Sequence, residues 1–228
     1  MVIPKHVYQT WGSYDIPKNI KVGMIYLRKK NRDFTYHFYD DDDCRDFIKS
    51  NFGDRVLNAY NTLKPGAYKA DLWRYCIMYI KGGIYLDIKY DTYGDFKLNE
   101  LIDQEYYVID IPSTPSGDGI YNALLVSEPG NEIYKKCIDR IVENVENRYY
   151  GESSLEITGP ILLRKIVNEN ENYLKTRKYD IENIKHPGNC RICRNEQIIF
   201  RVHKVKEYYK NYENHYSELY DARKVYND

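Results

Sequence analysis

One stretch of this chain, residues 70–91, constrains the fold more than any other, and it reads ADLWRYCIMYIKGGIYLDIKYD. Asp71 and Arg74 are three residues apart, so a helix places both side chains on one face. The pair Gly82-Gly83 predicts the end of that helix, because glycine readily adopts the left-handed backbone of a helix cap. The stretch therefore predicts a helix that is followed at once by a short strand.

The predicted strand, Ile84 to Asp91, carries acidic residues toward its end. Apolar and polar residues alternate along it, which is the pattern of a strand with one buried face. The polar set consists of Tyr85, Asp87, Lys89 and Asp91. We expect this set on one side of the strand end, where ligands bind in open α/β sheets. Acidic groups that face the Asp/Arg pair of the helix suit a hydroxyl-rich ligand with a phosphate or a metal.

The same stretch resembles the sugar-nucleotide segment of glycosyltransferase family 32. The family pattern runs A-x-x-(S)-D-x-x-R-Y-x-x-L-Y-x-x-G-G-x-Y-x-D-x-D. The matching residues here are Ala67, Asp71, Arg74, Tyr75, Tyr79, Gly82, Gly83, Tyr85 and Asp87. One departure stands out, because Lys89 occupies the position of the second Asp. That family includes yeast outer-chain mannosyltransferases and capsule transferases, and it is related to the glucosylating domains of clostridial toxins.

The remaining sequence predicts one α/β domain. Strands are expected at residues 2–11, 34–39, 106–111, 120–127 and 197–202, and helices at 18–30, 41–52, 53–63, 132–147 and from 160 onward. Early alternation of strands and helices favours a parallel sheet with helices on its faces, and later hairpin-like strands make the sheet mixed. The resemblance implies a Rossmann-like GT-A fold. We expect a nucleotide-binding half up to about residue 95 and an acceptor-side half after it, within a single domain of residues 1–228.

Composition argues against several function classes. Lysine plus arginine equals aspartate plus glutamate, at 34 each, so no basic surface predicts a nucleic-acid partner. No run of 18 or more apolar residues predicts a transmembrane segment, and Met1 to His6 does not have the pattern of a signal sequence. Five scattered cysteines suggest reduced thiols. We therefore expect a cytoplasmic protein without a membrane anchor.

The resemblance also implies contacts outside the central stretch. Residues 3–11, IPKHVYQTW, are similar to the opening segment of the family, which places Gln9 and Trp11 at the donor nucleotide. A tryptophan there can stack on a base, although core packing is the alternative. Asp40 ends an aromatic segment and is expected either at the nucleotide or as a helix cap. Three residues near the end of the chain match the segment that folds over the diphosphate: His215, Ser217 and Tyr220.

Two further segments match the second half of the family. Asn122 lies in an Asn-Ala segment and is expected to contact a donor or acceptor hydroxyl. Thr158 opens a Thr-Gly-Pro segment that matches the family, and its expected role is structural. The resemblance implies a retaining transferase that moves a sugar, UDP-linked in our expectation, from a nucleotide-sugar donor to a glycan or protein acceptor. We expect Asp71, Arg74 and Asp87 to carry catalysis.

The cofactor depends on how the chain meets the charge of the leaving diphosphate. Mg²⁺ or Mn²⁺ held by carboxylates is the usual solution. Asp87 supplies one carboxylate, and Asp91 is the expected second ligand because it lies two residues beyond Lys89 on the same strand face. The alternative is that the Lys89 ammonium takes the place of the metal, since lysine binds phosphate as a point charge. We expect the metal.

Two other function classes remain open on the sequence. One is a non-catalytic sugar-nucleotide binder that kept the fold and lost the metal site through Lys89. The other is a nucleotidyltransferase, which also uses acids at strand ends but prefers a nucleoside triphosphate.

Overall fold

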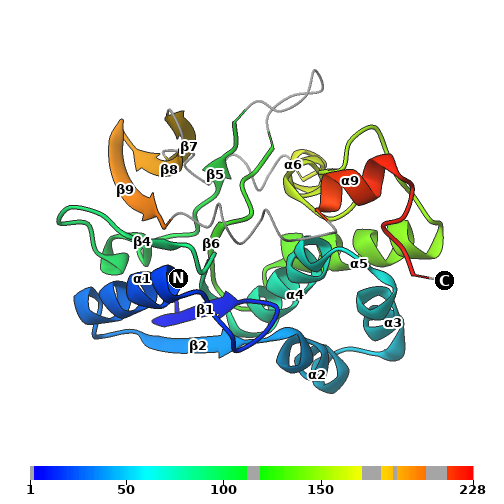
Figure 1. Cartoon of the computed structure of the whole chain (residues 1–228), viewed down its shortest axis with the longest axis horizontal. Coiled ribbons are helices and arrows are strands. Elements are labelled where there is room, and N and C mark those ends of the chain that lie inside the picture. Colours follow the sequence, from blue (N-terminus) through cyan, green and yellow to red (C-terminus); the bar gives the residue numbers. More distant parts are fainter. Residues whose placement is uncertain (1–2, 112–118, 171–180, 187–188, 204–214, 228) are drawn as a thin grey trace.

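The computed structural model describes residues 3–111, 119–170, 181–186, 189–203 and 215–227. Its first sheet has the order β2-β1-β3-β6, and Figure 1 labels β1, β2 and β6 of this sheet. These strands span Thr35–Tyr39, His6–Thr10, Gly83–Leu86 and Leu124–Ser127. Strand β1 runs parallel to β2 and to β3, whereas β6 is antiparallel to β3. The carboxyl ends of β1, β2 and β3 therefore meet at one edge of the sheet.

Helices cover one face of this sheet (Figure 1). Alternate strand residues, including Tyr8, Tyr85 and Leu125, point into a core cluster with apolar side chains of the helices. The helices involved are α2 (Asp41–Asn51), α3 (Asp54–Thr62), α4 (Gly66–Lys81), α5 (Glu132–Glu146), α6 (Pro160–Asn168) and α9 (Tyr216–Asp221). Helix α4 is buried almost all round, which identifies it as the central helix of this layer.

The other face packs against helix α1 (Lys18–Lys30) and a second sheet. The order of the second sheet is β4-β9-β8-β7-β5. Its strands span Tyr90–Thr92, Gln197–Val202, Asn189–Arg194, Ile181–His186 and Val108–Ile109, and a 3-10 turn, η1, spans Leu98–Leu101. Val7 and Ile84 of the first sheet share a core with Phe200 of the second. The two halves expected on either side of about residue 95 share both sheets. Strand β6 of the second half joins the first sheet, and β4 of the first half joins the second sheet.

The two glycines after α4 are required by the backbone. Gly82 ends the helix with φ +59°, and Gly83 follows with φ +98°, both in the region that favours glycine. A Cβ on Gly82 would lie 2.4 Å from the backbone nitrogen of Pro129, and one on Gly83 would lie 2.8 Å from the carbonyl oxygen of His6. The predicted helix stop is therefore confirmed, and it lets β3 enter the sheet directly beside β1.

Most predicted elements are confirmed, two of them to the residue. Helix α1 and strand β9 have the expected bounds. The expected strand from Ile84 to Asp91 is wrong, because β3 ends at Leu86 and a turn separates it from β4. Strands β7 and β8 and helix α9 were not predicted.

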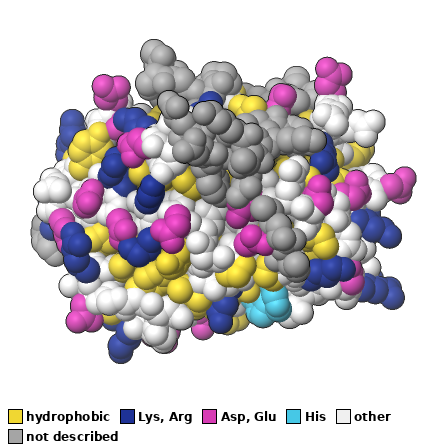
Figure 2. Space-filling view, turned by 180° about the vertical axis from the view of Figure 1, so that it is seen from behind, with side chains coloured by type: hydrophobic (Ala, Val, Ile, Leu, Met, Phe, Trp, Pro, Cys, Tyr) yellow, Lys and Arg dark blue, Asp and Glu magenta, His cyan; other side chains and the backbone are white. Residues whose placement is uncertain are grey.

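The described surface carries charges of both signs. Figure 2 shows lysine and arginine interspersed with aspartate and glutamate on the back of the molecule. Among the described residues, no helix combines the length and the apolar character that crossing a bilayer requires.

Candidate active site

Helix α4 carries the first two predicted site residues into the interior. Asp71 and Arg74 lie one turn apart on it, and each residue retains only 7% of its exposure. Ionised groups are costly to bury unless they are paired and hydrogen-bonded. The site is built from the groups that pair with them, which come from β3, from the segment before β6 and from the segment before α6.

Asp71 has its carboxylate bound on both oxygens. Asn122 Nδ2 donates to Oδ1 at 3.0 Å, and the Thr158 hydroxyl donates to Oδ2 at 2.8 Å. Arg74 completes the set at 3.5 Å. Burial raises the pKa of Asp71, and Arg74 and the two hydrogen bonds oppose that rise. A carboxylate fixed in this way is a rigid acceptor at the floor of the site.

Arg74 links the two acidic residues. Its guanidinium donates to the carbonyl oxygen of Asn122 at 2.7 Å and lies 3.7 Å from Asp87 Oδ1. The same group lies over the ring of Tyr85, 4.6 Å from the centroid. Planar stacking with several directed donors fixes its orientation. The predicted helix face thus meets the end of β3, as the sequence indicated.

Asp87 follows β3 directly and remains accessible, with 22% of its side chain exposed. The Tyr85 hydroxyl donates to Oδ1 at 2.7 Å, and Lys89 Nζ lies 3.2 Å from Oδ2. Burial acts to raise the pKa of Asp87, but Lys89 and Arg74 outweigh it and hold that pKa below its usual range. Asp87 is therefore an anion clamped between two cations.

Asp91 does not join Asp87, which corrects the expected metal pair. The chain turns after Asp87, with the Tyr90 amide donating to the Asp87 carbonyl oxygen at 2.9 Å. Asp91 then lies in the second sheet, where its 1% exposed side chain accepts from Arg201 Nε at 2.8 Å and from Arg201 NH2 at 2.9 Å. His203 Nε2 lies 3.3 Å from the same carboxylate. The physical reason is the turn, which moves Asp91 away from the end of β3, where Asp87 lies.

The residues present do not fit the Mn²⁺ or Mg²⁺ that we expected. No cluster of three or more His, Cys, Asp or Glu side chains in the described part of the chain is placed to hold a metal ion. Of the candidate carboxylates, Asp71 accepts a hydrogen bond from the protein on each oxygen and Asp91 is paired with Arg201. Asp87 faces the Lys89 ammonium. A divalent ion about 4 Å from that ammonium is repelled by about 8 kcal/mol at an effective dielectric of about 20.

Gln9 and Trp11 lie beside this site at the end of β1. Gln9 is 1% exposed, and its side-chain nitrogen has no hydrogen-bond partner among the described residues. Trp11 is half-buried against a small apolar cluster that includes Ile88 of the turn after Asp87. Both side chains therefore lie near the end of β3, and base stacking by Trp11 stays a prediction.

Asp40 acts as a helix cap, one of the two roles expected for it. Its carboxylate accepts from the Asp43 amide at 2.9 Å, and the Asp43 side chain accepts from the Asp40 amide at 3.2 Å. This reciprocal capping box begins α2. The cap explains Asp40 without a ligand, and a nucleotide contact stays a prediction.

Helix α9 carries two of the three predicted residues of the closing segment, Ser217 and Tyr220, and the third, His215, caps its start. His215 Nδ1 lies 2.7 Å from the Ser217 hydroxyl at the start of the helix, and the Tyr220 hydroxyl donates to the Gly151 carbonyl oxygen at 3.1 Å. Tyr216 packs against Tyr68, with ring centroids 6.0 Å apart. Because Tyr68 precedes Asp71 by one turn of α4, α9 lies beside the start of the site helix.

Three residues have a larger part in the site than the sequence suggested. Thr158 was expected to be structural, and its hydroxyl holds Asp71. Tyr85 holds Asp87, and the Tyr75 hydroxyl lies 2.8 Å from Asn122 Nδ2. The matched family positions included both tyrosines, which was the available signal. Since both amide hydrogens of Asn122 are used, its buried Oδ1, which lacks a described partner, is an open acceptor.

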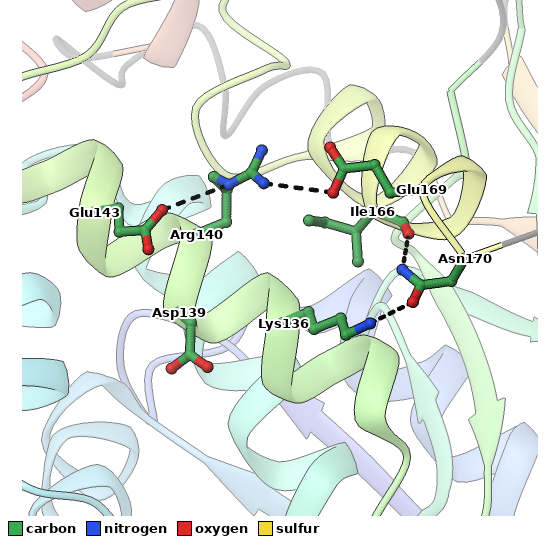
Figure 3. A pocket seen from close by; sticks show the side chains of 7 residues that line it. All are labelled: Lys136, Asp139, Arg140, Glu143, Ile166, Glu169 and Asn170. Atoms are coloured by element: carbon green, nitrogen blue, oxygen red, sulfur yellow. Dashed lines mark hydrogen bonds and ion pairs between the residues drawn. The ribbon is translucent and has the colours of Figure 1, made fainter.

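A separate cavity of about 290 Å³ lies between α5 and α6 (Figure 3). Two contacts cross the gap, from Arg140 to Glu169 at 3.4 Å and from Lys136 to Asn170, and Arg140 also contacts Glu143 on its own helix at 3.6 Å. None of the site residues lines it. We interpret this cavity as a charged contact between two helices.

The comparisons with known proteins identify the region that holds this site. Residues 17–108 match the family described as glycosyltransferase sugar-binding region containing DXD motif. An uncharacterized glycosyltransferase of Acanthamoeba polyphaga mimivirus is 29% identical over 74% of this chain and 66% of its own length. The initiation-specific alpha-1,6-mannosyltransferase of Schizosaccharomyces pombe is 26% identical over 81% of this chain and 56% of its own length. The chain spans about half to two thirds of the length of these relatives.

Solved toxin domains share the fold. The PaToxG glycosyltransferase matches with a TM-score of 0.54 at 19% identity, covering 76% of this chain and 74% of its own. The UDP-bound glycosyltransferase domain from the YGT toxin matches with a TM-score of 0.53 at 11% identity, covering 92% of this chain and 82% of its own. The chain has the mixed α/β GT-A fold of these domains. Residues 17–108 are similar to the glycosyltransferase sugar-binding region, and most of the chain is similar to yeast mannosyltransferases.

Proposed function

We propose that this chain, which carries a glycosyltransferase sugar-binding region, transfers a sugar from a UDP-linked donor to a glycan or protein acceptor. The observation that carries the proposal is the cluster of Asp71, Arg74 and Asp87, because it lies inside the matched region and at the carboxyl end of β3. The choice of UDP is supported by the UDP-bound structural neighbour. The sugar, the acceptor and the linkage are left open.

The site supplies groups suited to a sugar. Asn122 Oδ1 is a buried acceptor without a hydrogen-bond partner among the described residues, and the carboxylate of Asp71 is a second fixed acceptor beside it. The amide nitrogen of Gln9 is a buried donor that likewise lacks a described partner, near the end of β1. Arg74 fixes the positions of Asp71 and Asp87 relative to each other because it contacts both carboxylates. Side chains fixed before the substrate arrives bind it at a lower entropic cost.

Retention of the anomeric configuration is part of the proposal. A double-displacement mechanism needs a carboxylate close to the anomeric carbon. Both carboxylates of the site already accept hydrogen bonds from the protein, Asp71 on two oxygens and Asp87 from Tyr85. This supports front-side attack, in which the acceptor enters on the face that the diphosphate leaves. The anomeric configuration of the product, read by NMR, decides between retention and inversion.

A binder without catalysis is the main alternative, and a nucleotidyltransferase is the second. Calorimetry with UDP-glucose, UDP-galactose, UDP-N-acetylglucosamine, GDP-mannose and UTP separates the three, together with an assay for hydrolysis of the donor. A transferase binds at least one nucleotide sugar and releases its sugar slowly to water. Binding without release supports the non-catalytic binder, and tighter binding of UTP supports the nucleotidyltransferase. A folded protein that binds none of these compounds contradicts all three.

Asp87→Asn tests the site itself. The exchange removes the negative charge that Lys89 and Arg74 face while keeping the size of the side chain. We expect loss of turnover with an unchanged far-UV circular dichroism spectrum. Asp54→Asn, an exposed aspartate at the start of α3, is the matched control and retains wild-type turnover. Near-normal turnover in Asp87→Asn would place the reaction elsewhere.

A further inference from the structure

Lys89 stands where the D-x-D pattern has its second acid, and its place in the fold gives it a defined partner. Its ammonium lies 3.2 Å from Asp87 Oδ2, in the turn directly after β3. The side chain is 26% exposed, so it reaches the open side of the site. A positive group thus occupies the side of Asp87 on which the pattern would place a second metal ligand.

No other carboxylate among the described residues takes the place of the acid that Lys89 replaces. Asp91 lies in the second sheet with Arg201 on both oxygens, and Asp71 is held by Asn122 and Thr158. Two anions, Asp71 and Asp87, face two cations, Arg74 and Lys89, so the charges of these four groups sum to zero. A metal site that lacks its second carboxylate and gains an ammonium has lost both its ligands and its electrostatic attraction for a cation.

We propose that Lys89 itself supplies the positive charge that meets the diphosphate of the donor, so that the donor binds without a divalent cation. This inference rests on the proposed function and concerns the same site. Lysine suits the task because its ammonium is a point charge with three donors on a flexible stem. Asp87 is the positioning residue: it holds the ammonium at the end of β3 and is itself held by Tyr85 and Arg74.

The geometry also explains how one lysine serves two partners. An ammonium has three hydrogens, and the contact with Asp87 requires one of them. The side chain is 26% exposed, and its flexible stem lets the ammonium turn toward phosphate oxygens that arrive from the open side. As the glycosidic bond breaks, the bonding electron pair goes to the diphosphate oxygen, and the charge that grows there lies close to Lys89. The acceptor hydroxyl oxygen forms the new bond to the anomeric carbon, and its proton passes to the leaving diphosphate oxygen.

The test is a titration with UDP and, in parallel, GDP, by calorimetry in EDTA and again in Mn²⁺. We expect the wild-type dissociation constant to differ by less than about threefold between the two conditions. Lys89→Met should weaken binding in EDTA about tenfold or more, because a charge-assisted contact is lost. Lys49→Met is the matched control, since Lys49 is an exposed lysine on α2, and it should bind like the wild type.

Lys89→Asp gives the decisive contrast. This variant restores the two acids of the pattern, so it should bind UDP weakly in EDTA and regain affinity in Mn²⁺. Circular dichroism confirms folding for each variant, and Tyr85→Phe, which keeps Lys89, should bind independently of Mn²⁺ in the same assay.

Three results overturn the inference, and they are distinguishable. Wild-type binding that requires Mn²⁺ would refute the role of Lys89 and leave the proposed glycosyltransferase function standing. Binding of neither nucleotide under either condition would refute both. Equal affinity of wild type and Lys89→Met in EDTA would likewise refute the assignment of the charge to Lys89.

Discussion

Replacing Arg201 by glutamine tests whether Asp91 is a structural anchor of the second sheet. Asp91 is 1% exposed and receives two hydrogen bonds from Arg201, at 2.8 and 2.9 Å. Breaking a buried ion pair costs about 3–5 kcal/mol, because one charge is left buried without its partner. Here 44% of the Arg201 side chain is exposed, so water compensates in part. We therefore expect Arg201→Gln to lower the free energy of unfolding by about 2–3 kcal/mol at pH 7.

Urea denaturation followed by circular dichroism measures this loss, and Arg55→Gln is its matched control. Arg55 makes the same two-pronged contact with Glu146, with both distances at 2.6 Å. That pair is exposed, with 68% and 45% of the two side chains accessible. Exposed pairs contribute little to stability. The control should therefore lose much less stability than Arg201→Gln.

The pH dependence of the loss identifies Asp91 as its source. Burial acts to raise the pKa of Asp91, but His203 and Arg201 outweigh it and hold that pKa below the ordinary value of 3.8. In the wild type this stabilisation is present above that value and is lost as the pH falls through the lowered pKa. In Arg201→Gln the contribution of Arg201 is lost while that of His203 remains, so the pKa of Asp91 is higher than in the wild type and Asp91 takes up its proton at a higher pH. The difference in the free energy of unfolding between the wild type and Arg201→Gln should therefore narrow as the pH falls toward about 4.

Two outcomes would refute this reasoning. In the first, Arg201→Gln loses no more free energy of unfolding at pH 7 than the control Arg55→Gln does. In the second, the loss in Arg201→Gln stays constant from neutral pH to about 4. The affinity for UDP provides an independent check, and it should not change in Arg201→Gln. A large fall in the affinity for UDP with an unchanged free energy of unfolding would indicate that Asp91 takes part in binding the donor.

Two further substitutions test the supports of the site. Thr158→Val removes the hydroxyl that holds Asp71 at 2.8 Å, and we expect a loss of about 1–3 kcal/mol in the free energy of unfolding, measured by urea denaturation, together with lower turnover. Thr158→Ser, which keeps the donor, should restore most of both. Gly82→Ala places a Cβ 2.4 Å from Pro129 at a φ of +59°, so it should destabilise the protein by more than about 1 kcal/mol, whereas Gly53→Ala, which meets no atom within 4 Å, should not.

The charge pattern around Asp87 was open to prediction from the sequence only in part. The family pattern placed Asp71, Arg74, Asn122 and Asp87 at one site, and the structure brings these four side chains together. The strand from Ile84 to Asp91 was predicted from alternation alone. Alternation cannot distinguish one strand from two short strands joined by a turn, because the turn here preserves the apolar spacing of Ile84, Leu86 and Ile88.

The local sequence pattern could not predict the partner of Asp91 either. Arg201 is 110 positions away along the chain, and it meets Asp91 only because β4 pairs with β9. That pairing depends on the order of strands in the second sheet, and two strands of this sheet, β7 and β8, were not predicted. The expected Asp87/Asp91 metal pair was wrong because a local pattern was used to place residues that belong to different sheets.

The sequence by itself determined what depends on neighbouring residues. A helix puts Asp71 and Arg74 on one face, two glycines end it with positive φ, and β3 follows at once, so these features are set by backbone geometry over a few residues. Tertiary packing alone decided the partners. Asn122 and Thr158 reach Asp71 from 51 and 87 positions away, because two separate segments pack against the same buried helix. A buried charge must find its hydrogen bonds wherever the fold brings donors, and spacing along the chain does not encode that distance.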